Sequence, residues 1–131
     1  MSALSTAWKA ALHQGSANSA LTGTVKIAAI GAGYTFNAAH DFYDDVSAEV
    51  LGTPQTLASK AYSGRYFDAD NVTFAGINDP IQGFWIYIDT GTAGTSRLVA
   101  WLDDESIPTL PTDPGGLDYV LNFNALGIFG L

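Results

Sequence analysis

The sequence predicts a mainly β protein, a single-domain antiparallel β-sandwich or barrel of about six to eight short strands with one N-terminal helix. Fourteen glycines and five prolines are scattered between short apolar runs, which favours a turn-rich β fold over a helical bundle. The hydrophobic fraction is 47% and the charged fraction only 14%, which argues against a disordered chain. The 131 residues suffice for one domain, which we expect to span residues 1–131. Within it we expect the helix at about residues 3–14 and the β domain at about residues 22–131.

The N-terminal segment is the one stretch with a helical pattern. Leu4, Trp8, Ala11 and Leu12 are spaced so that they form one apolar stripe on a helix. Gly15 follows at the position where a helix end favours a left-handed residue. A helix of about three turns is too short to be stable alone, so we expect it to pack on a sheet or on a partner.

Strands are expected where β-branched and aromatic residues run between turn residues. The first covers Thr24–Ile30 and ends at a turn, Gly31–Gly33. Residues 38–55 mix acids and aromatics with Gly52-Thr53-Pro54, so we expect a loop there with one helical turn around Asp44–Glu49. The remaining strands are expected at Thr56–Tyr62, Arg65–Phe67, Asn71–Phe74, Ile81–Ile88, Arg97–Leu102 and Leu117–Phe123.

Three of the later segments carry further information about burial. Gly83–Ile88 is apolar on both parities, which predicts a central strand that is covered on both faces. Asp118–Phe123 alternates more clearly and predicts a strand that is buried on one side. The apolar tail Leu126–Leu131 is either a last edge strand or a docking element for another subunit, and the sequence leaves both interpretations open.

The charge of the chain limits its partners. Thirteen acidic residues against five basic ones give a formal net charge of −8, and no Lys or Arg occurs from Leu98 to Leu131. Such a chain repels a phosphate backbone and an anionic lipid surface, so we expect no nucleic-acid partner and no membrane partner. Its apolar runs are too short and too interrupted for a membrane-spanning helix, and the N-terminus lacks a signal-peptide pattern.

Catalytic and metal-binding patterns are sparse, so we expect neither an enzyme nor a cofactor. Cysteine is absent and there are two histidines, which makes a structural zinc site improbable. His40-Asp41 places a histidine beside a carboxylate, but no serine lies in a nucleophile motif, and a polar loop pair is favoured. Asp68, Asp70 and Asn71 lie close together in sequence and supply several side-chain oxygens, which are the ligands that calcium prefers. They lack the glycine and the distal glutamate of an EF-hand loop, so a solvated turn is favoured over a calcium site.

Several stretches of the chain together point to one family. After the N-terminal segment these are Thr24–Ala28, Tyr34–His40, Asp68–Phe74, Tyr87–Thr92, Ser96–Ala100 and Pro111–Gly116, before a short aliphatic and aromatic tail. In them the chain resembles a group of small structural proteins of tailed bacteriophages, often described as minor or decoration proteins of the head. The resemblance covers nearly the whole chain and contains no catalytic signature. The tail departs from the family pattern, because Gly130 stands before Leu131 where relatives tend to carry a basic residue.

The resemblance implies a virion structural protein that decorates or cements the outside of the capsid by binding the major capsid protein. The net charge of −8 agrees with an exterior position, since a DNA-filled interior penalises negative charge. A homo-oligomer, trimer or dimer, would add avidity on a symmetric lattice. We expect the partner contacts to come from Trp8 and Leu12 of the helix and from Ile128, Phe129 and Leu131 of the tail.

Two further hypotheses remain open at this stage. In the first, the protein belongs to the tail or to a fibre as a host-surface module, and aromatic residues such as Trp101 or Tyr66 stack on glycans. In the second it is a hydrolase that depends on His40-Asp41 and on the acidic clusters. Copy number per particle separates head from tail, and loss of a metal-dependent activity on substitution of Asp68 or Asp70 would support the hydrolase.

Overall fold

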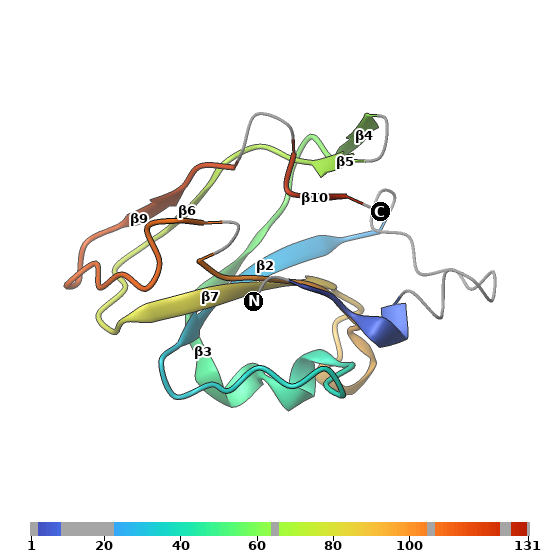
Figure 1. Cartoon of the computed structure of the whole chain (residues 1–131), viewed down its shortest axis with the longest axis horizontal. Helices are drawn as coiled ribbons and strands as arrows, with labels where there is room; N and C mark the ends of the chain where they lie inside the picture. Colours follow the sequence, from blue (N-terminus) through green and yellow to red (C-terminus); the bar gives the residue numbers. More distant parts are fainter. Residues whose placement is uncertain (1–2, 9–22, 64–65, 105–106, 124–126, 131) are drawn as a thin grey trace.

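Antiparallel strands make up most of the structure, a computed structural model that describes residues 3–8, 23–63, 66–104, 107–123 and 127–130 (Figure 1). Three short 3-10 helices, η1 (Tyr43–Asp45), η2 (Ser47–Glu49) and η3 (Ala93–Thr95), lie in its loops. The mainly β prediction is therefore confirmed. The strands in chain order are β1 (Ala3–Leu4), β2 (Val25–Gly31), β3 (Val50–Thr56), β4 (Ala61–Ser63), β5 (Tyr66–Asp68), β6 (Val72–Phe74), β7 (Ile81–Ile88), β8 (Leu98–Leu102), β9 (Tyr119–Leu121) and β10 (Phe129–Gly130).

A five-stranded antiparallel sheet with the order β1-β8-β7-β2-β3 forms the main layer. It is open rather than closed into a barrel. The central strand β7 has the bounds that the sequence predicts, and Trp85 in it lies opposite Ala28 of β2 and Trp101 of β8. Gly83 is buried in β7, and a Cβ there would lie 2.3 Å from the Trp101 ring. The glycine is thus needed for the close approach of that ring.

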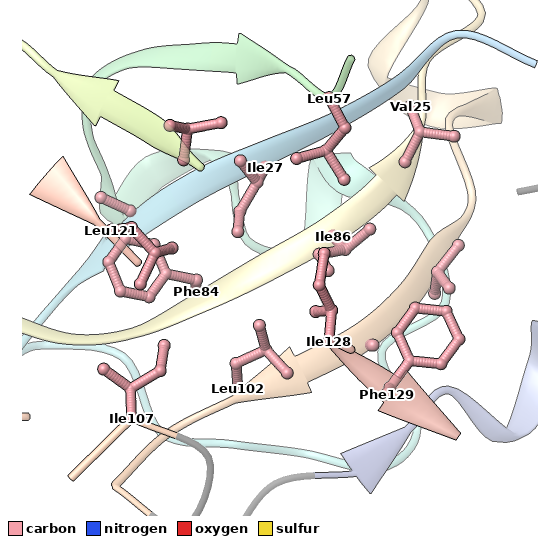
Figure 2. Packing of buried hydrophobic residues seen from close by; sticks show 14 of the residues in the cluster. Val25, Ile27, Leu57, Phe84, Ile86, Leu102, Ile107, Leu121, Ile128 and Phe129 are labelled. Atoms are coloured by element: carbon pink, nitrogen blue, oxygen red, sulfur yellow. The ribbon is translucent and has the colours of Figure 1, made fainter. Parts of the chain in front are cut away.

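Smaller ribbons cover one face of the main sheet and complete a sandwich-like arrangement (Figure 1). They are a three-stranded sheet, β10-β5-β4, and a two-stranded sheet, β6-β9. Between the layers lies an apolar core in which Phe84 packs against Phe74 at 5.4 Å and Tyr119 at 5.8 Å between ring centroids. Figure 2 shows Leu121 and Ile128 reaching this core from the covering ribbons.

The opposite face of the main sheet is covered by the segment between β2 and β3, which contains η1 and η2 (Figure 1). Tyr43 from this segment stacks on Tyr87 with 4.3 Å between ring centroids, and Val46 is 1% exposed beside it. Because both faces are covered, β7 is buried throughout its middle, as its uninterrupted apolar run predicts.

The predicted N-terminal helix begins later than expected. Ala3 and Leu4 pair with Trp101 and Ala100 of β8, and helical geometry starts only at Thr6. The edge of β8 offers backbone hydrogen bonds to Ala3 and Leu4, which therefore form a strand. Ser5 Oγ accepts a hydrogen bond from Trp8 N at 3.3 Å, as a residue that caps a helix start does. Residues 9–22, which include Ala11, Leu12 and Gly15, lie outside the described residues.

The strand predicted at Thr56–Tyr62 is only partly right, because Thr56 ends β3 and Ala61 begins β4 while residues 57–60 are not in a strand. β3 itself lies mostly where the sequence predicts a loop. Gly52 and Pro54 point to a loop in the sequence, yet β3 is an edge strand, where missing donors and irregular backbone are tolerated. Gly52 has φ +63°, and the pairing of β2 with β3 shifts register between Ile27 and Ala29. Strand geometry ends at Thr56, while Ser59 adopts φ +55°.

Candidate interaction site

Three of the five side chains expected to contact a partner are buried in the core of the chain itself. Trp8 is 1% exposed, and Ile128 and Phe129 are each 9% exposed. Phe129 meets Trp8 edge-on at 5.8 Å and stacks on Phe67 at 5.0 Å between ring centroids. The described part of the tail is therefore a core edge strand, β10, paired with β5. The other two expected contacts, at positions 12 and 131, lie outside the described residues.

His40 and Asp41 take part in loop packing. The Tyr34 hydroxyl lies 2.8 Å from Nδ1 of His40 and accepts a hydrogen bond from Trp85 Nε1 at 3.2 Å. Burial raises the pKa of Tyr34, which keeps this hydroxyl protonated. The Asp41 N–H donates to Asp45 Oδ2 at 2.9 Å, and this bond is the main cause of the lowered pKa of Asp45. The histidine thus supports the covering segment over the main sheet.

The two calcium candidates sit at the end of β5. Asp68 Oδ1 accepts a hydrogen bond from Ala69 N at 2.9 Å, and Asp70 N donates to Ala58 O at 2.9 Å. Within the part of the chain that the structure describes, no three His, Asp or Glu side chains gather as metal ligands would. The local hydrogen bonds account for Asp68 and Asp70 as turn residues.

The two aromatic residues considered for sugar stacking are not equivalent. Trp101 is 2% exposed, packed against Tyr34 at 5.3 Å and Trp85 at 5.6 Å between ring centroids, so its ring faces are covered. A hollow of about 300 Å³ beside it is lined also by Phe36 and by two carboxylates, Asp103 and Asp104. Tyr66 is half-buried in β5. A flat aromatic platform for a sugar is thus not offered by Trp101.

An opening in the surface lies beside β9. We call it the β9 groove, of about 480 Å³. One wall is the consecutive run Tyr119–Phe123, and the other is formed by Ile107, Pro108, Thr109 and Thr112. None of these residues carries a formal charge. The groove is therefore uncharged and lined by both aliphatic or aromatic and hydroxyl or amide side chains, although its segment of the chain contains acidic residues and no basic ones.

Backbone hydrogen bonds hold both walls in place. Thr112 pairs with Ile81 of β7 through two bonds, Ile81 N to Thr112 O at 2.7 Å and Thr112 N to Ile81 O at 3.1 Å. On the other wall, β9 pairs with β6, and Phe123 N donates to Asn71 Oδ1 at 2.9 Å. Leu121 is 1% exposed and anchors β9 in the core. The groove is thus a preformed feature of the fold.

Exposed apolar side chains mark the same ribbon. Leu117 is 73% exposed and Val120 is 53% exposed, and they are the large hydrophobic residues that stand out to solvent among those described. Sequence reasoning did not single them out as a site. The alternation of Asp118–Phe123 was the available signal, because it buries Leu121 and turns Val120 to the opposite side.

The surroundings of the groove are negatively charged. Asp113 and Asp118 stand next to the lining residues Thr112 and Tyr119 in sequence. Each Asp is fixed locally, since Asp113 Oδ1 accepts from Gly115 N at 3.0 Å and Asp118 Oδ1 accepts from Gly76 N at 3.1 Å. With no Lys or Arg from Leu98 to Leu131, these carboxylates have no basic neighbour in their own segment.

Comparison of the chain with protein-family models, with curated proteins and with solved structures gives no significant match. In the portion of the chain that is described, no helix is both long and apolar enough to cross a membrane. The functional conclusion therefore depends on the chain's own residues.

Proposed function

We propose that this chain is a structural protein of a bacteriophage virion that decorates or cements the outside of the capsid by binding the major capsid protein. The observation that carries the proposal is the uncharged β9 groove together with the exposed apolar side chains of Leu117 and Val120, on a chain with a net charge of −8. Apolar surface of this kind gains free energy when a partner protein covers it.

The packing of the aromatic residues supports a binding role. Trp8, Trp85 and Trp101 are each at most 2% exposed, and His40 is engaged by a tyrosine hydroxyl. The three tryptophans fill the two cores of the sandwich and stabilise its shape. What the described surface presents to a partner is thus shape, apolar contact area and negative charge.

The charge and the sequence resemblance give the proposal its partner. A net charge of −8 favours a position outside a DNA-filled shell. Resemblance to phage head proteins over nearly the whole chain supports the major capsid protein as the surface that is bound. An interface of standard size, about 800 Å² per partner, would be needed for stable attachment of each copy. A trimer or dimer of this chain would strengthen attachment through several simultaneous contacts.

Quantitative gel densitometry of purified particles tests the proposal. We expect on the order of hundreds of copies per particle, because a decoration protein follows the symmetry of the capsid lattice. A few dozen copies or fewer would indicate a position in the tail instead of the head. Absence of the protein from intact particles would contradict the proposal. Light scattering of the purified chain separately tests the expected dimer or trimer.

A further inference from the structure

We propose that the β9 groove binds an extended segment of a partner protein, which adds as a strand to the free edge of β9 and carries alternating aliphatic and basic side chains. This inference deepens the proposed function, since the major capsid protein would supply the segment. Strand addition uses backbone hydrogen bonds for affinity and side-chain pockets for selectivity.

The position of the groove relative to β9 indicates an edge site. All five residues from Tyr119 to Phe123 line the groove. Successive side chains in a strand point to opposite faces, so these five include residues from both faces. The groove therefore runs along the strand and not over one of its faces. Among the described strands β9 pairs with β6 alone, so its second edge has no strand partner.

The edge of β9 also lacks several of the features that normally block strand addition. Edge strands are usually protected by a lysine, a proline, a bulge or very short length. The exposed edge strand β3 has Pro54 and the left-handed Gly52, and β1 has only two residues. β9 has three residues, and the run Asp118–Phe123 around it contains no Lys, Pro or Gly. Neither a proline nor a lysine therefore blocks an added strand at this edge.

The dimensions and chemistry of the groove define the segment. Five consecutive lining residues at about 3.3 Å each span about 16 Å, which fits an added strand of about five residues. Ile107 and Pro108 on the facing wall and the exposed Val120 offer contacts to aliphatic side chains. The acidic residues around the groove, without a basic residue in the segment, favour Lys or Arg at the solvent-facing positions of the added strand. A second copy of this chain fits poorly, because two such acidic edges repel each other.

The first experiment titrates the 15N-labelled chain with a synthetic peptide of alternating valine and lysine and follows backbone amide shifts. We expect changes concentrated in residues 107–112 and 117–123. Replacing lysine by glutamate in the peptide should weaken binding at least about tenfold, and N-methylation of the amides along one edge should abolish it. Shifts elsewhere, no shifts at these residues, or equal binding of the N-methylated peptide would overturn the inference.

Val120→Lys is the matched variant, because Val120 is exposed and its replacement should leave the fold intact. Thr53→Lys is its control, since it places the same charge at an exposed β-branched position of β3. We expect Val120→Lys to lose peptide binding about tenfold or more and Thr53→Lys to lose none. Sedimentation of both variants checks the second-copy alternative, since dimers that only Val120→Lys dissociates would also overturn the inference.

Binding to capsids that lack the protein separates this inference from the proposed function. If wild-type chain and Thr53→Lys bind and Val120→Lys does not, both stand. If Val120→Lys binds capsids as well as wild type does, the groove is not the docking surface, while the decoration role survives. If wild-type chain does not bind capsids but binds the peptide at β9, the decoration role fails and the strand-addition site survives.

Discussion

The two strands nearest the C-terminal end of the described chain, β9 and β10, have opposite environments. In β10, Phe129 is 9% exposed and packs between Trp8 and Phe67. In β9, Val120 is 53% exposed and faces a groove. Both segments are apolar in sequence, and the more apolar of the two, around Phe129, is the buried one.

The difference shows that apolarity near a chain end does not identify an interface. What decides is whether another part of the same chain covers the strand. β10 is covered because β5 pairs with it and the N-terminal segment brings Trp8 over its aromatic ring. β9 is covered on the Leu121 side only. Substitutions in and beside the two strands test this contrast, and two others, in β7 and directly after it, test the packing of the main sheet.

Phe129→Ala should have the largest effect on stability. Removing a buried aromatic side chain leaves a cavity between Trp8 and Phe67, and the expected loss in free energy of unfolding is about 3–5 kcal/mol. Urea denaturation measures it, with Leu117→Ala as the exposed control. A loss below about 1 kcal/mol for Phe129→Ala would mean that β10 is peripheral after all.

Gly83→Ala should also destabilise, by about 1–3 kcal/mol, through overpacking. The added Cβ would lie 2.3 Å from the Trp101 ring and 2.7 Å from the Leu102 carbonyl oxygen. Because the carbonyl belongs to the backbone of β8, the clash cannot be relieved by a side-chain rotation alone. Thermal unfolding followed by tryptophan fluorescence is the measurement. Gly76→Ala, at a position with open space but φ +59°, separates steric overlap from backbone strain.

Asp89→Asn should have a smaller effect that depends on pH. The Gly91 N–H, and then Lys26 at 3.0 Å from Asp89 Oδ2, lower the pKa of Asp89. A carboxyl whose pKa is lower in the folded state stabilises the fold above its unfolded pKa of about 4, and this contribution is lost as pH falls further. We therefore expect Asp89→Asn to be less stable than wild type at pH 7 and to approach it at pH 3. Equal differences at both pH values, measured by urea denaturation, would contradict this.

Val120→Thr and Leu117→Ser should have the smallest effects on stability, within about 0.5 kcal/mol, because both side chains already face solvent. The combined variant should reduce binding of a fluorescent hydrophobic dye to the folded chain, since the dye reports exposed apolar surface. A loss of stability close to that of Phe129→Ala would show that β9 is as buried as β10. This result would contradict the difference in burial between β9 and β10.

Sequence reasoning succeeded where one periodicity dominates a segment. The strand bounds Ile81–Ile88 were predicted correctly, and so was the burial on both faces that the apolar run Gly83–Ile88 indicates. β2, β6 and β8 were placed within one or two residues. β3 was missed because Gly52 and Pro54 indicate a loop unless the strand is known to lie at a sheet edge. Strand order is a property of the whole fold, so a local pattern could not supply it.

The candidate site was harder to predict for the same reason. Trp8, Ile128 and Phe129 were expected at an interface, yet their burial depends on partners far away in sequence. The alternation around Val120 did predict a strand buried on one side. It could not show that residues 107–112 form a second wall beside that strand, because the wall is held by hydrogen bonds to β7.

The contact between Trp8 and Phe129 has a consequence for synthesis of the chain. Trp8 can reach Phe129 only after every residue between the two has been translated. Until then, the apolar pocket of about 240 Å³ that Leu4 and Ile128 line from opposite ends of the sequence stays incomplete. A nascent chain therefore exposes this surface to chaperones and to aggregation until β10 emerges from the ribosome.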